Sequence, residues 1–322
     1  MKLVREQARS LQRVAVVGAA GFVGRRLAAA LLRAEVNTAC LTRRSRFMLD
    51  NDVAHPLHRA DIVFYLASSI NPALGERHPE WAAADHELFS TLLERLSGLD
   101  SPPTVVLTSS GGTVYSPSCP APYAETDPLR PNGSYGAAKL ALEHELLNHA
   151  DRLPAVVLRL SNVYGPGQAV GSGQGVLAYW LAAAARREPL TLIGNPDNTR
   201  DYVYVDDVVE ALCLVRSPVG RAAVAPGSPL VLNIGSGVST SLSELAQVVQ
   251  DVADVRLPVR LLPGRPFDRD HVWLDVRQAE RTLGWRPRTS LLDGVAAAWQ
   301  ATPSRPQRLA EPISLRKADH AS

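Results

Sequence analysis

A glycine-rich turn between a strand and a helix limits most strongly what this chain can fold into. Four apolar residues at 14–17 are followed by Gly-Ala-Ala-Gly-Phe-Val-Gly at 18–24. The apolar run predicts a buried parallel strand, with a helix to about Arg33 and a second strand over 36–41. Strand, glycine turn, helix and strand in this order predict the first βαβ unit of a dinucleotide-binding fold.

Each glycine of this turn has a predicted physical role. Gly18 permits the tight turn, Gly21 lets the backbone approach a pyrophosphate, and Gly24 lets the helix pack on the strand. The helix N-terminus, at Phe22 and Val23, attracts the negative charge of the pyrophosphate. We therefore expect a nicotinamide dinucleotide here, the alternative being a tight turn that binds no ligand.

The segment after the second strand bears on the choice of cofactor. An NAD-preferring site usually has an acidic residue there that holds the ribose hydroxyls, but this chain reads Leu-Thr-Arg-Arg-Ser-Arg at 41–46. Arg43 and Arg44 can instead hold the 2′-phosphate of NADP by charge-assisted hydrogen bonds. The sequence favours NADP, with NAD as the alternative and a solvated basic loop as the reading without a ligand.

Strands and helices continue to alternate along the chain, which predicts an α/β fold. The next strand, 62–67, follows so soon that the crossover before it has little room and is expected to be irregular. The later predicted elements are helix 80–97, strand 104–107, helix 135–147, strand 155–160, helix 175–187, strand 189–193 and helix 206–215. Hydroxyl side chains and glycines gather at 108–115, after a parallel strand, where ligands bind in such sheets.

Tyr135 and Lys139 stand four residues apart in the predicted helix 135–147. Positions i and i+4 lie on one helix face, so the phenol and the ammonium can point into one site. A nearby cation lowers the pKa of a phenol toward the working range of an acid–base catalyst. An ordinary helix with an amphipathic Tyr and a solvated Lys is the alternative for the pair taken alone.

Composition narrows the class of protein. The chain has 46% hydrophobic and 20% charged residues with a net charge of +2, and its basic residues are scattered, so we expect neither a nucleic-acid nor a membrane partner. The three cysteines are widely spaced and form neither a metal pattern nor a disulfide framework, which makes a reducing cytoplasm the natural setting. We read no signal peptide in the charged residues 1–12 and no metal site.

Seven ordered motifs together resemble the extended short-chain dehydrogenase/reductase family, in particular its nucleotide-sugar epimerases, dehydratases and ketoreductases. They are GAAGFVG at 18–24, YLAS at 65–68, SSGGTVY at 109–115, YGAAK at 135–139, SNVYGPGQ at 161–168, TRDYVYVDD at 199–207 and LGWRP at 283–287. The resemblance spans about residues 13–295. It implies a Rossmann-like, doubly wound parallel sheet with a smaller C-terminal substrate-binding lobe, and it makes a chance origin of the Tyr–Lys pair improbable.

The resemblance implies roles for individual residues. Tyr135 would exchange a proton with a sugar oxygen, and Lys139 would bridge the nicotinamide ribose hydroxyls and lower the pKa of the phenol, so both would also contact the cofactor. The motif at 65–68 adds Leu66 and Ala67 to the expected cofactor contacts. The usual catalytic hydroxyl position falls on a glycine, Gly111, so we predict Thr113 in that role, with Ser110 second. Asp85 is another departure, where the family helix often supplies an Asn.

We expect an N-terminal extension at 1–12, a dinucleotide-binding domain at 13–165 with chain crossovers to the second lobe, and a mainly nucleotide-sugar-binding lobe at 166–300. Prolines and mixed charge predict a disordered tail at 301–322. The resemblance implies that a nucleoside diphosphate would meet Asn162, Arg200 and Arg265, while Asp268 would meet a ribose or hold Arg265. A homodimer through helices 80–97 and 135–148 is expected.

The expected reaction is hydride transfer at C4 of a nucleoside-diphosphate sugar. We favour an NADPH-dependent 4-ketoreductase acting on an NDP-4-keto-6-deoxyhexose of deoxysugar biosynthesis, because of Arg43 and Arg44. The alternative is a 4-epimerase with tightly bound NAD. A 4,6-dehydratase is disfavoured because Gly111, Gly112 and Thr113 stand where such enzymes have Thr-Asp-Glu. A non-catalytic cofactor-sensing protein is a remote alternative, since this chain keeps both Tyr135 and Lys139.

Overall fold

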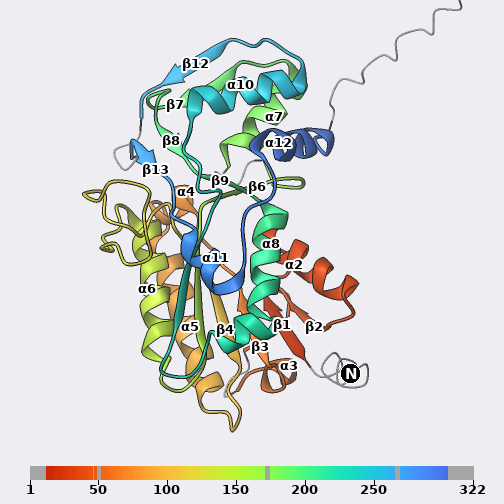
Figure 1. Cartoon of the computed structure of the whole chain (residues 1–322), viewed down its shortest axis with the longest axis vertical. Helices are drawn as coiled ribbons and strands as arrows, with labels where there is room; N and C mark the ends of the chain where they lie inside the picture. The colour runs from red at the N-terminus through yellow and green to blue at the C-terminus, as the bar shows by residue number, and fades with distance from the viewer. Residues whose placement is uncertain (1–11, 46, 49–51, 171–174, 265–268, 304–322) are drawn as a thin grey trace, which may run out of the picture.

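A parallel six-stranded sheet forms the centre of the molecule in the computed structural model, which describes residues 12–45, 47–48, 52–170, 175–264 and 269–303 (Figure 1). Its strands run in the order β10-β5-β4-β3-β1-β2, and every pairing is parallel. They are β1 (Arg13–Val17), β2 (Asn37–Leu41), β3 (Ile62–Tyr65), β4 (Thr104–Ser110), β5 (Ala155–Leu160) and β10 (Leu230–Ile234).

Helices cover both faces of this sheet (Figure 1). On one face lie α2 (Phe22–Arg33), α8 (Val205–Val215) and α11 (Arg277–Leu283), and on the other lie α5 (Pro79–Ser97) and α6 (Ser134–Asn148). Alternate residues of a strand point to opposite faces, so Val14 and Val16 join the α2 side while Ala15 and Val17 join the α5 side. The predicted doubly wound α/β fold is confirmed.

The crossover between β2 and β3 is short, as expected. Its described residues contain the four-residue helix α3 (His55–His58), which places the buried Leu57 against the α5 side of the sheet. A second short helix, α4 (Pro72–Gly75), follows β3 and is capped by the Asn71 side chain. Proline in the first turn suits both helices, because the missing N–H has no partner inside the helix there.

Later elements form a second, smaller core beside the sheet. It contains α7 (Val176–Arg186), α10 (Leu242–Ala253) and α12 (Leu291–Gln300), with β7 (Leu190–Ile193) paired to β12 (Val259–Leu262). Short strands lie between the two cores, namely β6 (Asn162–Tyr164) on β9 (Tyr202–Tyr204), and β8 (Thr199–Arg200) between β11 (Thr240–Ser241) and β13 (His271–Val272). The helix α9 (Pro218–Ala222) follows α8. The proposed boundary between domains at residues 165 and 166 stays a prediction.

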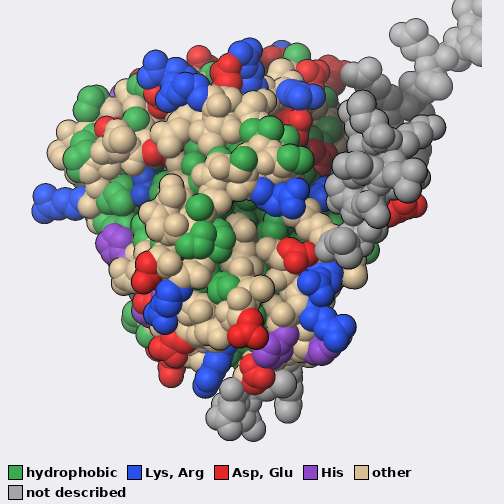
Figure 2. All heavy atoms as spheres, turned by 60° about the horizontal axis from the view of Figure 1, so that its bottom comes forward, with side chains coloured by type: hydrophobic (Ala, Val, Ile, Leu, Met, Phe, Trp, Pro, Cys, Tyr) green, Lys and Arg blue, Asp and Glu red, His purple; other side chains and the backbone are tan. Residues whose placement is uncertain are grey.

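The predictions for residues 1–11 and 304–322 lie outside the described part of the chain. Within that part, no helix has both the length and the apolar character that a membrane span requires. Figure 2 shows one face of the molecule, where basic and acidic side chains are interspersed. On this face the scattered charge matches the pattern read from the sequence.

Candidate active site

Tyr135 and Lys139 lie in the first two turns of α6, as predicted. Lys139 is 6% exposed, its Nζ lies 3.5 Å from the carbonyl oxygen of Thr108, and it lies 5.9 Å from the centre of the Tyr135 ring. Burial lowers the pKa of Lys139 to about 8, against the opposing influence of the Asp85 and Glu143 carboxylates. The ammonium and the phenol therefore occupy one site.

Thr113 lies directly against the helix that carries these two residues. A Cβ on Gly136 would come within 2.6 Å of the Thr113 carbonyl oxygen and 3.2 Å of the Thr113 Cβ, so only glycine lets α6 approach so closely. The start of α6 is fixed by Glu76, whose carboxylate accepts hydrogen bonds from the Ser134 N–H at 2.7 Å and the Ser134 hydroxyl at 3.0 Å. The sequence order Ser-Tyr-Gly thus places Tyr135 beside the loop after β4.

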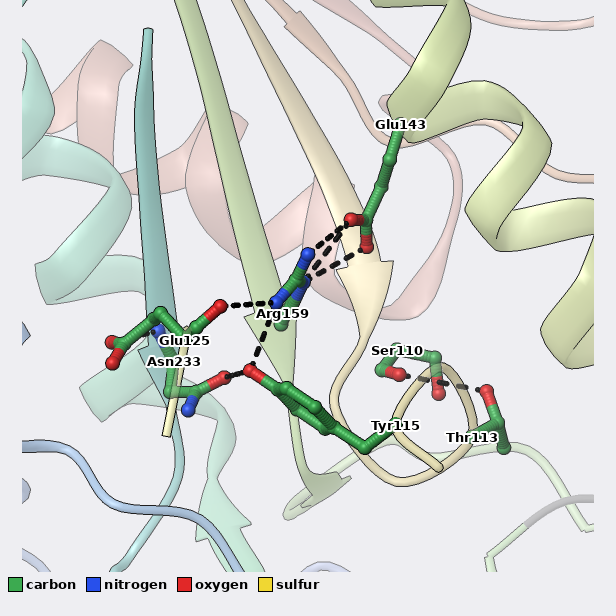
Figure 3. Close-up of polar contacts among 7 residues, drawn as sticks. All are labelled: Ser110, Thr113, Tyr115, Glu125, Glu143, Arg159 and Asn233. Atoms are coloured by element: carbon green, nitrogen blue, oxygen red, sulfur yellow. Dashed lines mark hydrogen bonds and ion pairs between the residues drawn. The ribbon is translucent and has the colours of Figure 1, made fainter. Parts of the chain in front are cut away.

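The loop after β4, residues 111–115, is a tight turn that holds Thr113, whereas Ser110 is the last residue of β4. The N–H groups of Thr113 and Val114 donate to the carbonyl oxygen of Ser110 at 3.1 and 3.2 Å, and the Thr113 hydroxyl reaches the same oxygen at 3.5 Å (Figure 3). Gly111 has no room for a side chain, because a Cβ there would lie 2.6 Å from Leu274 Cδ1. Thr113 contacts the Tyr135 helix through its carbonyl oxygen and Cβ, and the choice of Thr113 over Ser110 as the catalytic hydroxyl stays a prediction.

A buried polar network supports this loop and α6 together (Figure 3). Arg159 on β5 pairs with Glu143 on α6, with Nη2 and Oε2 at 2.7 Å, and donates through Nη1 to the Tyr115 hydroxyl at 3.0 Å. The Tyr115 hydroxyl donates to Asn233 Oδ1 at 2.6 Å, and burial raises the pKa of Tyr115 to about 12, so this phenol stays neutral. Glu125 receives the Asn233 N–H at 2.8 Å and contributes its carbonyl oxygen to Arg159.

The glycine turn after β1 fits the pyrophosphate of a dinucleotide. Gly18 has a φ of +94°, and a Cβ there would lie 2.7 Å from the Ala67 nitrogen, so the turn lies against the loop after β3 that holds Leu66 and Ala67. A Cβ on Gly24 would collide with the Gly18 carbonyl oxygen. No side chain caps α2 and its first turn has no acidic residue, which leaves the N–H groups of Phe22 and Val23 suited to an anion.

Arg43 and Arg44 are exposed in the turn after β2, and neither forms an ion pair with another described residue. Arg43 lines a cavity of about 230 Å³ together with Ser69, Trp81 and Ala84. These residues come from the ends of β2 and β3 and from the start of α5, beside the glycine turn. The place is suited to the adenosine end of a dinucleotide.

Asp85 is partly buried on α5 and accepts a hydrogen bond from the Ser69 N–H at 2.6 Å. Its carboxylate is one of the two that raise the pKa of Lys139. The residue that departs from the family pattern is therefore not a solvated helix position. It holds the loop after β3 and places a negative charge near the candidate catalytic site.

The four predicted substrate residues have different outcomes. Asn162 is exposed on β6, and its main-chain and side-chain N–H groups both donate to the Asp201 carbonyl oxygen at 3.0 Å. Arg200 is partly exposed on β8, with Nη1 2.8 Å from the Thr199 carbonyl oxygen. Arg265 and Asp268 lie outside the described residues. Their roles stay predictions.

Comparison with known proteins identifies the family. Residues 14–235, more than half of the chain, match the model of the NAD-dependent epimerase/dehydratase family. The chain belongs to this family. The expected kinship with the nucleotide-sugar group of the extended short-chain dehydrogenases/reductases is thereby confirmed.

Members of the epimerase/dehydratase family with different reactions are similar to this chain. A UDP-glucose 4-epimerase of Mycolicibacterium smegmatis is 30% identical over 308 residues, which cover 88% of this chain and 96% of that protein. A dTDP-4-dehydro-6-deoxyglucose reductase of Escherichia coli is 33% identical over 194 residues, which cover 59% of this chain and 58% of that protein. The UDP-glucose 4-epimerase of Thermus thermophilus, solved with NAD, has a TM-score of 0.77 at 27% identity, covering 90% of this chain and 98% of that one.

Two parts of the site were missed from the sequence. Glu143 follows Lys139 by one helical turn, a spacing that already placed it on the same face of α6. Its partner Arg159 stands in an apolar strand, and no local pattern pairs it with Glu143, Tyr115 or Asn233. Among the described residues, no group of three or more His, Cys, Asp or Glu side chains is arranged to hold a metal ion.

Proposed function

We propose that this protein is an NADPH-dependent 4-ketoreductase that acts on a nucleoside-diphosphate 4-keto-6-deoxyhexose. The main support for an oxidoreductase is the close approach of Tyr135, Lys139 and Thr113. Gly136 allows the helix α6 to contact the loop that carries Thr113. The glycine turn and the uncapped N-terminus of α2 supply a place for the cofactor in the same sheet. A keto-sugar reduction needs a hydride donor and a proton donor, and these elements suit both.

The residues of the candidate site would each have a separate role in the reduction. When bound, the nicotinamide cofactor supplies the hydride. Tyr135 donates its proton to the sugar oxygen, while the Thr113 hydroxyl donates a hydrogen bond that orients that oxygen. Lys139 would favour the ionised form of the Tyr135 phenol through its positive charge, which acts in a buried position 5.9 Å from the centre of the ring. Asn162 and Arg200 would hold the diphosphate.

NADP is proposed over NAD because of the turn after β2. Arg43 lines a cavity next to Ser69 and Trp81, and no described carboxylate forms an ion pair with it. A guanidinium there suits a 2′-phosphate better than two ribose hydroxyls. The similarity to a dTDP-4-dehydro-6-deoxyglucose reductase supports the same choice of reaction.

A 4-epimerase with tightly bound NAD is the second candidate. It is favoured by the nearly full-length similarity to UDP-glucose 4-epimerases, one of them solved with NAD. Tyr135, Lys139 and Thr113 would serve it equally well, because an epimerase carries out the same hydride and proton transfers in both directions.

The state of the cofactor separates the two candidates. The purified protein is denatured and the released nicotinamide measured, and the native protein is titrated with NADPH and NADH by fluorescence. For the reductase we expect an empty site that binds NADPH more tightly, and oxidation of NADPH on addition of a dTDP- or UDP-linked 4-keto-6-deoxyhexose. One retained NAD per chain, with interconversion of a UDP-hexose and its C4 epimer, would establish the epimerase instead.

A further inference from the structure

Arg269 contacts the loop that carries Thr113, although it belongs to a much later part of the chain. Its Nη2 donates to the carbonyl oxygen of Tyr115 at 2.5 Å and reaches that of Thr113 at 3.5 Å. Its guanidinium also lies 6.0 Å from the centre of the Tyr123 ring. A charged side chain thus holds two backbone carbonyls of the loop that bears the candidate catalytic hydroxyl.

Residues 269–275, here called the bridging segment, cover the same loop with an apolar layer. Leu274 occupies the space in which a side chain at position 111 would stand. Val272 and Leu274 share a buried cluster with Val114 and Tyr115. The bridging segment therefore fixes the loop after β4 through Arg269 at one end and through apolar packing at the other.

The opposite edge of the bridging segment contacts Arg200, the predicted diphosphate ligand. Strand β13 within the segment pairs with β8, in a register that sets Val272 opposite Arg200. The carbonyl oxygen of Asp270 accepts the Thr199 N–H at 2.7 Å and lies 3.4 Å from Arg200 Nη1. The bridging segment therefore contacts both Arg200, the predicted diphosphate ligand, and the loop that carries the candidate catalytic hydroxyl.

We propose that Arg269 is a positioning residue that couples nucleoside-diphosphate binding at β8 to the placement of the Thr113 hydroxyl. The inference rests on the proposed function. A ligand bound by Arg200 orders β8 and the bridging segment. The Arg269 guanidinium, which is part of that segment, then fixes the carbonyl groups of Thr113 and Tyr115 through its hydrogen bonds. A small misplacement of a catalytic group costs about a hundredfold in rate. The planar Arg269 guanidinium can therefore affect the rate by fixing the loop, without contacting the substrate.

Kinetics of Arg269→Met and Arg269→Lys test the coupling. We expect the methionine variant to lower kcat at least about tenfold with a KM within about twofold of wild type, because the nucleotide contacts remain. Lysine restores the charge but not the fork and should recover part of the loss. Arg288→Met is the matched control, since Arg288 is 74% exposed in a surface pair with Glu210. A raised KM with unchanged kcat would overturn the proposal.

A double-variant cycle tests whether Arg269 acts through Thr113. In a Thr113→Val background the hydroxyl is already absent, so Arg269→Met should lower kcat by less than about twofold. If the two losses multiply in full, Arg269 acts independently of Thr113 and the coupling is wrong.

Hydrogen exchange of residues 110–115 gives a readout that needs no turnover. On addition of UDP or dTDP we expect exchange of these amides to become slower in the wild-type protein and to stay unchanged in Arg269→Met. Equal protection in both proteins would overturn the role of Arg269 and leave the proposed function standing. Failure of both nucleotides to bind the wild-type protein would overturn the proposed function and this inference with it.

Discussion

Glu143 and Arg159 form an ion pair with Oε2 and Nη2 2.7 Å apart, in a site where their side chains are 0% and 3% exposed. Glu143 lies one turn beyond Lys139 on α6, and Arg159 lies on β5, so the pair connects the helix of Tyr135 and Lys139 to the sheet. Arg159 also donates to the Tyr115 hydroxyl (Figure 3). The same guanidinium therefore holds the helix of Tyr135 and the loop of Thr113.

Breaking this pair on one side should destabilise the protein strongly. Arg159→Met leaves the Glu143 carboxylate buried and uncompensated, which typically costs about 3–5 kcal/mol. The double variant Glu143→Leu, Arg159→Met removes both charges and should recover most of that loss. Urea unfolding of the cofactor-free protein measures this, with the exposed Arg152→Met as control. A double variant no more stable than Arg159→Met would show that the loss does not come from the uncompensated Glu143 carboxylate.

Lys139 should reduce stability at neutral pH while serving the reaction. Burial lowers the pKa of Lys139 from 10.5 to about 8. Between these two pH values the unfolded chain binds the proton more readily than the folded protein, so the stability of the folded protein falls as the pH drops from 10.5 to about 8. Lys139→Met should therefore stabilise the cofactor-free protein by about 3 kcal/mol at pH 7, with loss of turnover. The gain should shrink above pH 8 and vanish near pH 10.5. Urea unfolding across this range would contradict the account if the gain stayed constant.

Asp85→Asn should lower the pKa of Lys139 further. The Asp85 carboxylate raises that pKa, and asparagine keeps an acceptor for the Ser69 N–H while removing the charge. Lys139 is the one lysine among the described residues, because the other two, Lys2 and Lys317, lie outside them. Reductive methylation of the lysines with ¹³C, followed by an NMR titration, measures the pKa of Lys139 directly. An unchanged titration in Asp85→Asn would remove Asp85 from the electrostatics of the site.

The features that depend on local sequence pattern were predictable from the sequence. The helix expected at 135–147 is Ser134–Asn148, and the glycines at 18, 21 and 24 form the expected turn, because periodicity and backbone freedom act over a few residues. The partners of Arg159 were not predictable, since Tyr115 and Asn233 meet it from 44 and 74 residues away only after the sheet forms. The contacts of Arg269 with the carbonyl groups of Thr113 and Tyr115 were not predictable either, because they join distant parts of the chain.

Thr113 should matter more to the chemical step than Ser110. Thr113→Val removes the hydroxyl beside the Tyr135 helix at nearly constant volume, and loss of one such donor costs roughly a hundredfold in kcat. Ser110→Ala should cost less than about threefold, because its hydroxyl belongs to the strand end rather than to the loop against α6. Single-turnover reduction measures both. The reverse order of effects would move the catalytic role to Ser110.

Arg43→Ala separates the two cofactors. A 2′-phosphate gains charge-assisted hydrogen bonds from a guanidinium, whereas a ribose hydroxyl gains little, so the variant should weaken NADPH binding by about tenfold and leave NADH binding within about twofold. Fluorescence titration of each cofactor measures the two constants. Arg33→Ala is the control, because Arg33 is an exposed arginine in the last turn of α2 and does not line the cavity that Arg43 lines. Equal weakening of both cofactors would assign Arg43 to the structure of the turn after β2, and it would remove the main support for NADP over NAD.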